Sequence, residues 1–142
     1  RFFLDGLRIE TRAPTSAPRV VVTTPAGQMH ELGALAVAAT AATEGWQVTY
    51  LGPDLPAEEI VAAVGHLQAG VLALSIVHPP DDPYLVQELV TLRRGLPPGV
   101  AIFAGGRSAS AYQREIEEIG ATTLSDLAGL RFALEDIRAT KR

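Results

Sequence analysis

A single histidine in a loop ahead of a predicted helix is the residue whose type and place are best suited to chemistry. His30 falls in the run Gln28-Met29-His30-Glu31-Leu32-Gly33. The positive end of a helix dipole disfavours the protonated imidazole, and the neutral imidazole is the form that binds a metal ion. Gln28 can accept a hydrogen bond from the other ring nitrogen and so fix the ring. Gly33 lets a planar ligand approach the helix closely. His30 is therefore a candidate metal ligand.

Small residues mark two further strand ends. Ser75 closes one predicted strand, followed by Val77 two residues later, and its hydroxyl can hydrogen-bond either a ligand that enters between strands or nearby backbone. Gly105 and Gly106 close the next strand, where they either clear side chains from the rim of the sheet or form an ordinary turn. Taken singly, each feature also has a structural explanation, and a loop histidine such as His30 is often only solvated.

These residues fall at the ends of strands in a predicted alternation of strands and helices. The expected strands are 19–23, 46–51, 70–75, 100–104 and 121–124, and the expected helices are 31–44, one from about 56, 84–94, one from Ser108 or Ser110 to 119, and one from Ser125 or Asp126 to about 139. Strict alternation with right-handed crossovers predicts an α/β fold: a flavodoxin-like (Rossmann-like), doubly wound five-stranded parallel sheet of order 2-1-3-4-5. Ligands of this fold bind beyond the carboxyl ends of the strands, where the three loops meet.

Composition limits the kind of partner. The chain has 142 residues, 47% of them hydrophobic, which suits one domain with a sizeable core. Only 20% of its residues are charged and its net charge is −4, so it lacks the basic footprint of a nucleic-acid-binding segment. It contains no cysteine, which excludes disulfides and thiolate metal sites. The apolar stretch 33–43 is too short for a membrane span, so a cytoplasmic protein is expected.

The first residues read as an extension of the domain. Residues 1–18 contain Pro14 and Pro18 around Thr15 and Ser16, a composition typical of a linker, and the folded domain is expected over residues 19–142. The chain starts at Arg1 without an initiator methionine, so we expect a piece of a longer protein.

Taken together, the three loops resemble the cobalamin-binding domain family, whose pattern is D-x-H-x-x-G after the first strand, S-x-L after the third and G-G after the fourth. The sequence reads Gln28-x-His30-x-x-Gly33, Ser75-x-Val77 and Gly105-Gly106. It departs from the pattern at Gln28, where the family has an acid, and at Val77, where it has leucine. The H-E-L-G form is most similar to the carboxyl-terminal domain of MerR-type, light-responsive transcriptional regulators.

This resemblance implies a definite mode of cofactor binding. The nucleotide tail of cobalamin leaves the cobalt and inserts between the sheet and the first helix, while His30 takes its place as the lower ligand, the base-off/His-on mode. Ser75 then contacts the dimethylbenzimidazole end, and Gly33, Gly105 and Gly106 make room. Adenosylcobalamin is the expected form, with methyl- or hydroxocobalamin as alternatives. The uncharged Gln28 implies weaker cobalt ligation than in the family's enzymes.

The resemblance also implies a sensory role and no enzymatic activity. In such regulators a DNA-binding helical domain and a helical bundle precede this fold, and adenosylcobalamin controls oligomerisation until light breaks the cobalt–carbon bond. We therefore expect upstream domains and a homo-oligomer. Direct contact of this segment with nucleic acid or with a membrane is not expected.

Other functions remain open at this point. A corrinoid carrier domain of a methyltransferase or mutase system would use the same histidine, and the departure at Gln28 also allows a ligand-free interaction domain. A flavin site finds only a partial phosphate loop in residues 23–27. A phosphoacceptor receiver domain is disfavoured because Thr23, Thr24 and Ser75 stand where it needs acids.

A second loop leaves its role undecided. His78, Asp81 and Asp82 follow the third strand on the expected rim, but prolines surround them, and a solvated loop explains them as well as a site does.

Overall fold

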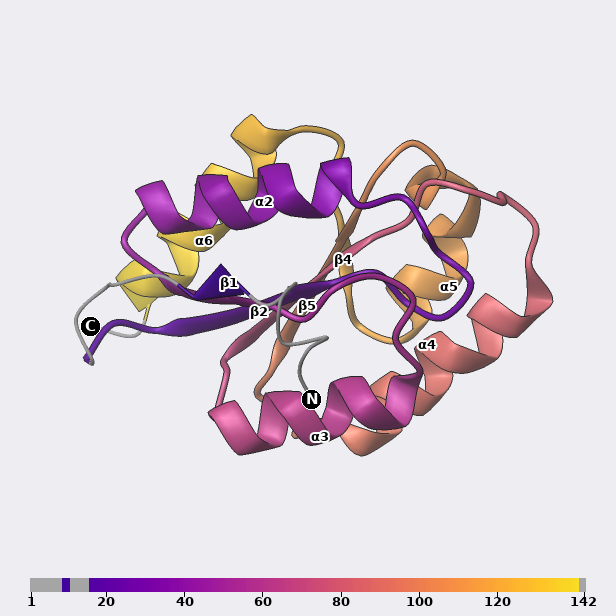
Figure 1. Ribbon diagram of the computed structural model, residues 1–142, viewed down its shortest axis with the longest axis horizontal. Helices are drawn as coiled ribbons and strands as arrows, with labels where there is room; N and C mark the ends of the chain where they lie inside the picture. Colours follow the sequence, from indigo (N-terminus) through magenta and orange to yellow (C-terminus); the bar gives the residue numbers. More distant parts are fainter. Residues whose placement is uncertain (1–8, 11–15, 141–142) are drawn as a thin grey trace.

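The computed structural model describes residues 9–10 and 16–140, which form three layers (Figure 1). A central sheet separates α2 (Leu32–Thr43) and α6 (Leu127–Thr140) on one face from the other helices on the opposite face. The opposite layer holds α3 (Ala57–Leu67), α4 (Pro83–Gly95), the 3-10 turn η1 (Ala109–Tyr112) and α5 (Gln113–Glu118). In this part of the chain, no helix combines the length and hydropathy that a membrane span needs.

The sheet confirms the predicted topology. Its strands are β1 (Ile9–Glu10), β2 (Arg19–Thr23), β3 (Gln47–Tyr50), β4 (Val71–Ser75), β5 (Ala101–Gly105) and β6 (Thr122–Thr123). They lie in the order β1-β3-β2-β4-β5-β6, and every pair from β3 to β6 is parallel. Without β1 this is the expected order 2-1-3-4-5. The carboxyl ends of β2, β4 and β5 therefore lie along one edge, as the motif analysis requires.

One edge strand was not expected from the sequence. In β1, Ile9 pairs with Tyr50 and Glu10 with Thr49, antiparallel to β3. This strand lies within residues 1–18, which the sequence assigns to a linker. Residues 1–8 and 11–15 lie outside the described part of the chain, so the domain boundary at residue 19 stays a prediction.

The first parallel strand shows why the sheet is covered on both faces. Along β2, Val20 and Val22 pack into the core under α2 and α6, and Val21 packs into the core under α3 and α4. All three side chains are at most 1% exposed. Successive side chains of a strand point to opposite faces, so a continuous apolar run places apolar groups on both faces. Both faces must then be covered by helices, as is usual for parallel sheets.

Helix α2 lies close to the sheet because its inner face is small. Ala34, Ala38 and Ala41 are buried there, while Trp46 and Tyr50 are the largest side chains of the same core. Alanine side chains are small, so the space between helix and sheet is filled by Tyr50 of β3 and by Trp46, which immediately precedes β3. The start of this helix also lines the candidate site, through Gly33, Ala36 and Val37.

One of two predicted helix starts turns out differently, and the other is as expected. The segment after β5 opens as η1 and becomes α-helical only at Gln113. Ser108 precedes η1 but makes no capping bond, because its hydroxyl donates to the carbonyl of Val77 at 2.6 Å. The predicted cap of the last helix is found at Asp126, whose carboxylate accepts from the N–H of Gly129 at 2.7 Å. A tertiary contact has replaced the local one in the first case.

Helix α3 is capped from a different element. Pro56 precedes it and offers no side-chain acceptor, and the N–H of Ala57 donates instead to Glu88 Oε1 of α4 at 2.8 Å. Ala57 is fully buried and Glu88 is 6% exposed. An unpaired buried N–H is costly, and a carboxylate at the positive end of a helix is favourable. Glu88 therefore joins α3 to α4 as well as capping α3.

We expect Glu88→Ala to lower the free energy of unfolding by about 1–3 kcal/mol, because it leaves the N–H of Ala57 buried without an acceptor. Urea unfolding followed by far-ultraviolet circular dichroism measures the change. Glu88→Gln keeps an amide oxygen at the same place and should lose clearly less stability. Equal stability of the native and alanine proteins would contradict the capping role.

Candidate functional site

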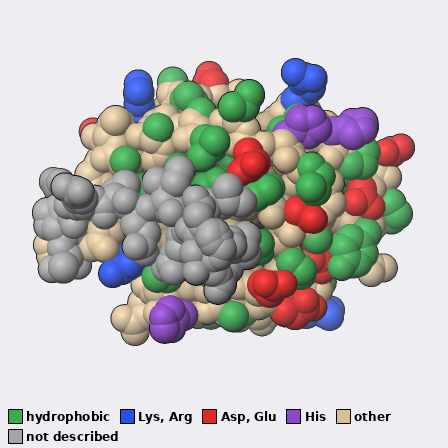
Figure 2. All heavy atoms as spheres, viewed as in Figure 1, with side chains coloured by type: hydrophobic (Ala, Val, Ile, Leu, Met, Phe, Trp, Pro, Cys, Tyr) green, Lys and Arg blue, Asp and Glu red, His purple; other side chains and the backbone are tan. Residues whose placement is uncertain are grey.

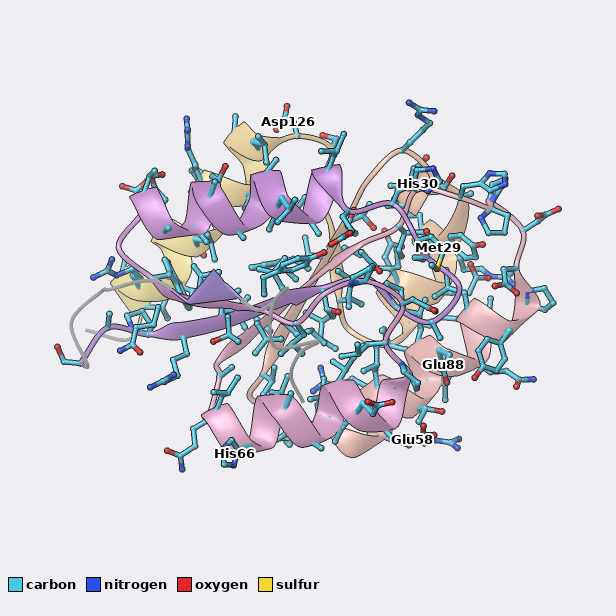
Figure 3. The ribbon with its side chains drawn as sticks, viewed as in Figure 1. Met29, His30, Glu58, His66, Glu88 and Asp126 are labelled. Carbon is cyan, nitrogen blue, oxygen red and sulfur yellow. The ribbon has the colours of Figure 1, made fainter. Side chains whose placement is uncertain are left out.

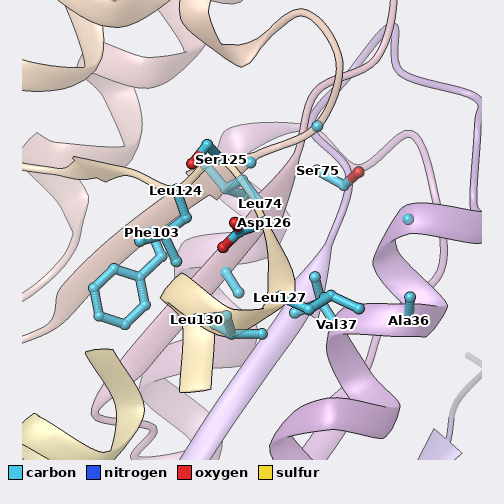
Figure 4. A pocket seen from close by; sticks show the side chains of 14 residues that line it. Ala36, Val37, Leu74, Ser75, Phe103, Leu124, Ser125, Asp126, Leu127 and Leu130 are labelled. Carbon is cyan, nitrogen blue, oxygen red and sulfur yellow. The ribbon is translucent and has the colours of Figure 1, made fainter. Parts of the chain in front are cut away.

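A pocket opens at the carboxyl edge of the sheet, between α2, the ends of β4 and β5, and the start of α6 (Figure 4). Its volume is about 190 Å³. Among the predicted site residues, the pocket brings together Gly33, Ser75, Gly105 and Gly106. These four come from the start of α2 and the ends of β4 and β5, which are far apart in the sequence, so these motif positions share one cavity.

The walls of the pocket are largely apolar. Its lining includes Ala73, Leu74, Phe103, Leu124 and Leu130. Ser125 and Asp126 add polar groups from exposed positions ahead of α6. The buried part of such a pocket suits a flat apolar group.

Ser75 is the buried polar residue of this lining. It is 3% exposed, and its Oγ has no hydrogen-bond partner among the described residues. Buried hydroxyls in native proteins are nearly always paired, so an unpaired one asks for an explanation. Because Ser75 also lines the pocket, its hydroxyl is placed to hydrogen-bond an atom of a ligand inside it.

The glycines around the pocket differ in what they make possible. A Cβ on Gly33 would lie 3.0 Å from Ser75 Oγ, so a side chain there would crowd the hydroxyl. Gly106 has φ +110°, and a Cβ would collide with the backbone oxygen of Ile76. Gly33 therefore leaves room beside the Ser75 hydroxyl. Gly106 is required because its backbone passes close to the backbone of Ile76, just after β4.

His30 lies outside the pocket, on the loop that leads into α2 (Figure 3). Its side chain is exposed, as is that of Met29 beside it. Histidine side chains lie at the upper right of the face in Figure 2, the side to which the loops after β2 and β4 run in Figure 1. An exposed imidazole on this rim is accessible to a metal centre that arrives with a ligand.

Gln28 has a different role from the one expected. It is 1% exposed, and its Oε1 accepts hydrogen bonds from the N–H groups of Val77 at 2.8 Å and His78 at 3.1 Å. An amide oxygen has two lone pairs, and both are used here. The expected bond from His30 to this oxygen is therefore not made. Gln28 instead ties the His30 loop to the loop after β4, and its Nε2 is buried without a partner in the described residues.

Val77 contributes its backbone to this tie, while its side chain is not part of the pocket lining. Its N–H donates to Gln28, and its carbonyl accepts from the Ser108 hydroxyl at 2.6 Å. The Tyr112 hydroxyl continues the network by donating to Pro79 and accepting from the N–H of Asp82. Burial raises the pKa of Tyr112 above its ordinary value, so this phenol stays a donor. The loop after β4 is thus held from both sides.

A third loop joins the same network. The Thr24 hydroxyl donates to the carbonyl of Gln28 and accepts from the N–H of Asp54 at 2.7 Å. Asp54 Oδ1 in turn accepts from the N–H of Gly27 at 2.8 Å. No sequence signal marks these residues as part of the site, since each is an ordinary turn former and only their tertiary pairing distinguishes them.

The undecided residues of the second loop divide into two groups. Asp82 Oδ1 accepts from the N–H of Tyr84 at 3.0 Å and caps α4, so it has a structural role. His78 and Asp81 are exposed. His78 meets the His30 loop through its backbone bond to Gln28.

The fold and the pocket define a flavodoxin-like α/β domain with a ligand cavity at the carboxyl edge of its sheet. Residues 18–125 match the model of the B12 binding domain. The chain belongs to this family. The predicted family and the binding of a cobalamin or other corrinoid by such a domain are thereby confirmed.

Two relatives and one solved structure extend this result. The chain is 30% identical to the HTH-type transcriptional repressor CarA of Myxococcus xanthus over 106 residues, 75% of this chain and 36% of the repressor. It is 33% identical to the HTH-type transcriptional repressor CarH of the same organism over 90 residues, 63% of this chain and 30% of the repressor. The monomethylamine corrinoid protein of Methanosarcina barkeri superposes with a TM-score of 0.68 at 27% identity, covering 82% of this chain and 57% of that one.

The relatives also bear on the kind of protein. The chain spans about a third of the length of the two repressors. Both are named as repressors, and the family is a binding module, so the prediction of a non-enzymatic domain is confirmed.

We expect Gln28→Ala to speed the amide hydrogen exchange of Val77 and His78 by about tenfold or more, because both N–H groups lose their acceptor. Exchange followed by nuclear magnetic resonance measures it. Gln28→Glu keeps an oxygen at the same place and should preserve the protection. Unchanged exchange in the alanine variant would show that Gln28 does not hold the loop.

Proposed function

We propose that this chain binds cobalamin in the base-off/His-on mode, as the sensory domain of a transcriptional regulator. The observation that carries the proposal is the buried Oγ of Ser75, which lines a largely apolar pocket and has no hydrogen-bond partner among the described residues. Dimethylbenzimidazole is a flat apolar group, and its ring nitrogen becomes a free acceptor once it leaves the cobalt. A largely apolar pocket with one buried hydroxyl suits a group of this chemistry.

Each predicted site residue finds a place in this proposal. Ser75 would donate to the ring nitrogen, and Gly33 leaves the approach to it open. His30 would bind cobalt from its exposed position on the rim. Gly105 and Gly106 shape the far wall, and Gln28 and Val77 hold the loops together. When bound, adenosylcobalamin would supply a cobalt–carbon bond that light can break.

Exposed apolar side chains beside His30 support a large ligand on this rim. Met29 is 63% exposed and Leu32 is 85% exposed. Leu127, which lines the pocket from α6, is 40% exposed. Large exposed apolar side chains are typical of a surface that a ligand or a partner covers.

The regulatory role rests on the two repressors. CarA and CarH are HTH-type transcriptional repressors and are longer than this chain. By analogy we infer upstream DNA-binding and helical-bundle domains, assembly into a homo-oligomer, light dependence and a cytoplasmic location. Adenosylcobalamin is the proposed form of the cofactor.

A corrinoid carrier domain is the second candidate function. The likeness to the monomethylamine corrinoid protein favours it. The sequence of the encoding gene upstream of residue 1 discriminates the two. A helix-turn-helix domain there supports the regulator, and a methyltransferase-type partner domain or a carrier bundle supports the alternative.

We expect His30→Ala to weaken the binding of hydroxocobalamin by at least about tenfold, because cobalt loses a protein ligand. The change in the visible absorption bands that accompanies ligation should also disappear. Titrations followed by visible absorption measure both. His66→Ala is the matched control, since His66 is an exposed histidine on α3 (Figure 3), far from this rim in the fold. Identical spectra for the native and His30→Ala proteins would remove His30 from the site.

Ser75→Ala should have opposite effects on stability and binding. Without ligand, it removes a buried hydroxyl that has no partner, so the variant should unfold no earlier than the native protein in a thermal melt. Its affinity for hydroxocobalamin should fall by about three- to tenfold, the value of one hydrogen bond. Its affinity for cobinamide, which lacks the base, should stay unchanged. Equal losses for both ligands would place the base elsewhere.

A further inference from the structure

A buried tyrosine holds the chain on the other side of His30. The Tyr50 hydroxyl donates a hydrogen bond to Glu31 Oε1 at 2.7 Å. Tyr50 is 1% exposed at the end of β3. Burial, together with the Glu31 carboxylate, raises the pKa of this phenol well above its ordinary value. The hydroxyl therefore stays protonated, and it remains a donor to Glu31 at any physiological pH.

The Glu31 side chain is used for this bond and not for capping. Glu31 immediately precedes α2, and its side chain makes no capping bond there. Its backbone carbonyl nevertheless opens the helix by accepting from the N–H of Leu35 at 2.9 Å. Residue 31 is thus fixed by α2 through its backbone and by β3 through its side chain.

We propose that Tyr50 is a positioning residue for His30 and acts through Glu31. The inference rests on the proposed role of His30 as a cobalt ligand. His30 lies between two anchored residues: Gln28 is tied to the loop after β4, and Glu31 is tied to β3. A ligand on a loop fixed on both sides loses less conformational freedom when it binds, so the bond to the metal is stronger.

The tether, rather than the charge of Glu31, is the part that matters in this inference. Glu31→Gln keeps an amide oxygen that can accept from Tyr50, and Glu31→Ala removes the acceptor altogether. Tyr50→Phe removes the donor and keeps the ring in the core. The three variants therefore separate the hydrogen bond from the charge and from the packing.

The test uses the 142-residue chain loaded with cob(II)inamide, which carries no nucleotide base. Any axial nitrogen detected by electron paramagnetic resonance then comes from the protein. The native chain should show the three-line nitrogen splitting, and His30→Ala should lack it. In Tyr50→Phe and in Glu31→Ala, the ratio of nitrogen-bound to nitrogen-free cobalt should fall by about three- to tenfold, whereas Glu31→Gln should keep the native ratio.

Arg138→Ala is the control for loss of a tertiary hydrogen bond that holds the same helix. Arg138 Nη1 donates to the carbonyl of Glu44 at 2.7 Å, at the end of α2 opposite His30. This variant should keep the native ratio, and an equal fall there would assign the effect to a general loosening of α2 and overturn the inference.

The remaining outcomes are distinguishable. Native ratios in Tyr50→Phe and Glu31→Ala would overturn the positioning role and leave His30 ligation standing. A native chain without nitrogen splitting would overturn His30 ligation itself. If Tyr50→Phe fails to fold, as judged by circular dichroism, Glu31→Ala decides the question, because Glu31 is only partly buried.

Discussion

The geometry of the rim depends on one buried amide oxygen. Gln28 Oε1 accepts from two successive N–H groups, those of Val77 and His78, and so joins the loops after β2 and β4. Ser108 and Tyr112 hold the second loop from its other side, and Thr24 holds the first. Backbone groups in loops must find partners, and here they find them in side chains of neighbouring loops. The site is therefore preorganised by loop-to-loop bonds.

Much of this arrangement follows from the sequence, and the reason differs between its parts. Buried parallel strands need apolar residues on both faces, so the run from Val20 to Val22 predicts β2 directly. Ser75 and Gly105 stand at the ends of their strands. Because the carboxyl ends of parallel strands lie along one edge of a sheet, these positions predict a shared cavity. Local pattern and topology together are sufficient for these features.

Other features depend on contacts that no local pattern encodes. Glu88 caps a helix 31 residues away, and Tyr50 reaches Glu31 across 19 residues. The sequence suggests the nearby His30 as the partner of Gln28. In the structure Gln28 instead accepts from a loop 49 residues further on. The edge strand β1 pairs only two residues and leaves no periodic signal. Polar side chains with several available partners are the least predictable part of such a site.

The site separates into two halves with different physical demands. The pocket keeps Ser75 buried without a partner, a cost to folding that a ligand acceptor would offset. The rim keeps His30 exposed on a loop whose neighbours are anchored. Since the pocket lining and the rim hydrogen bonds share no side-chain partner, a change such as the neutral Gln28 can alter the rim without altering the pocket. We therefore expect retention of the inserted group and ligation of the metal to vary independently among such domains.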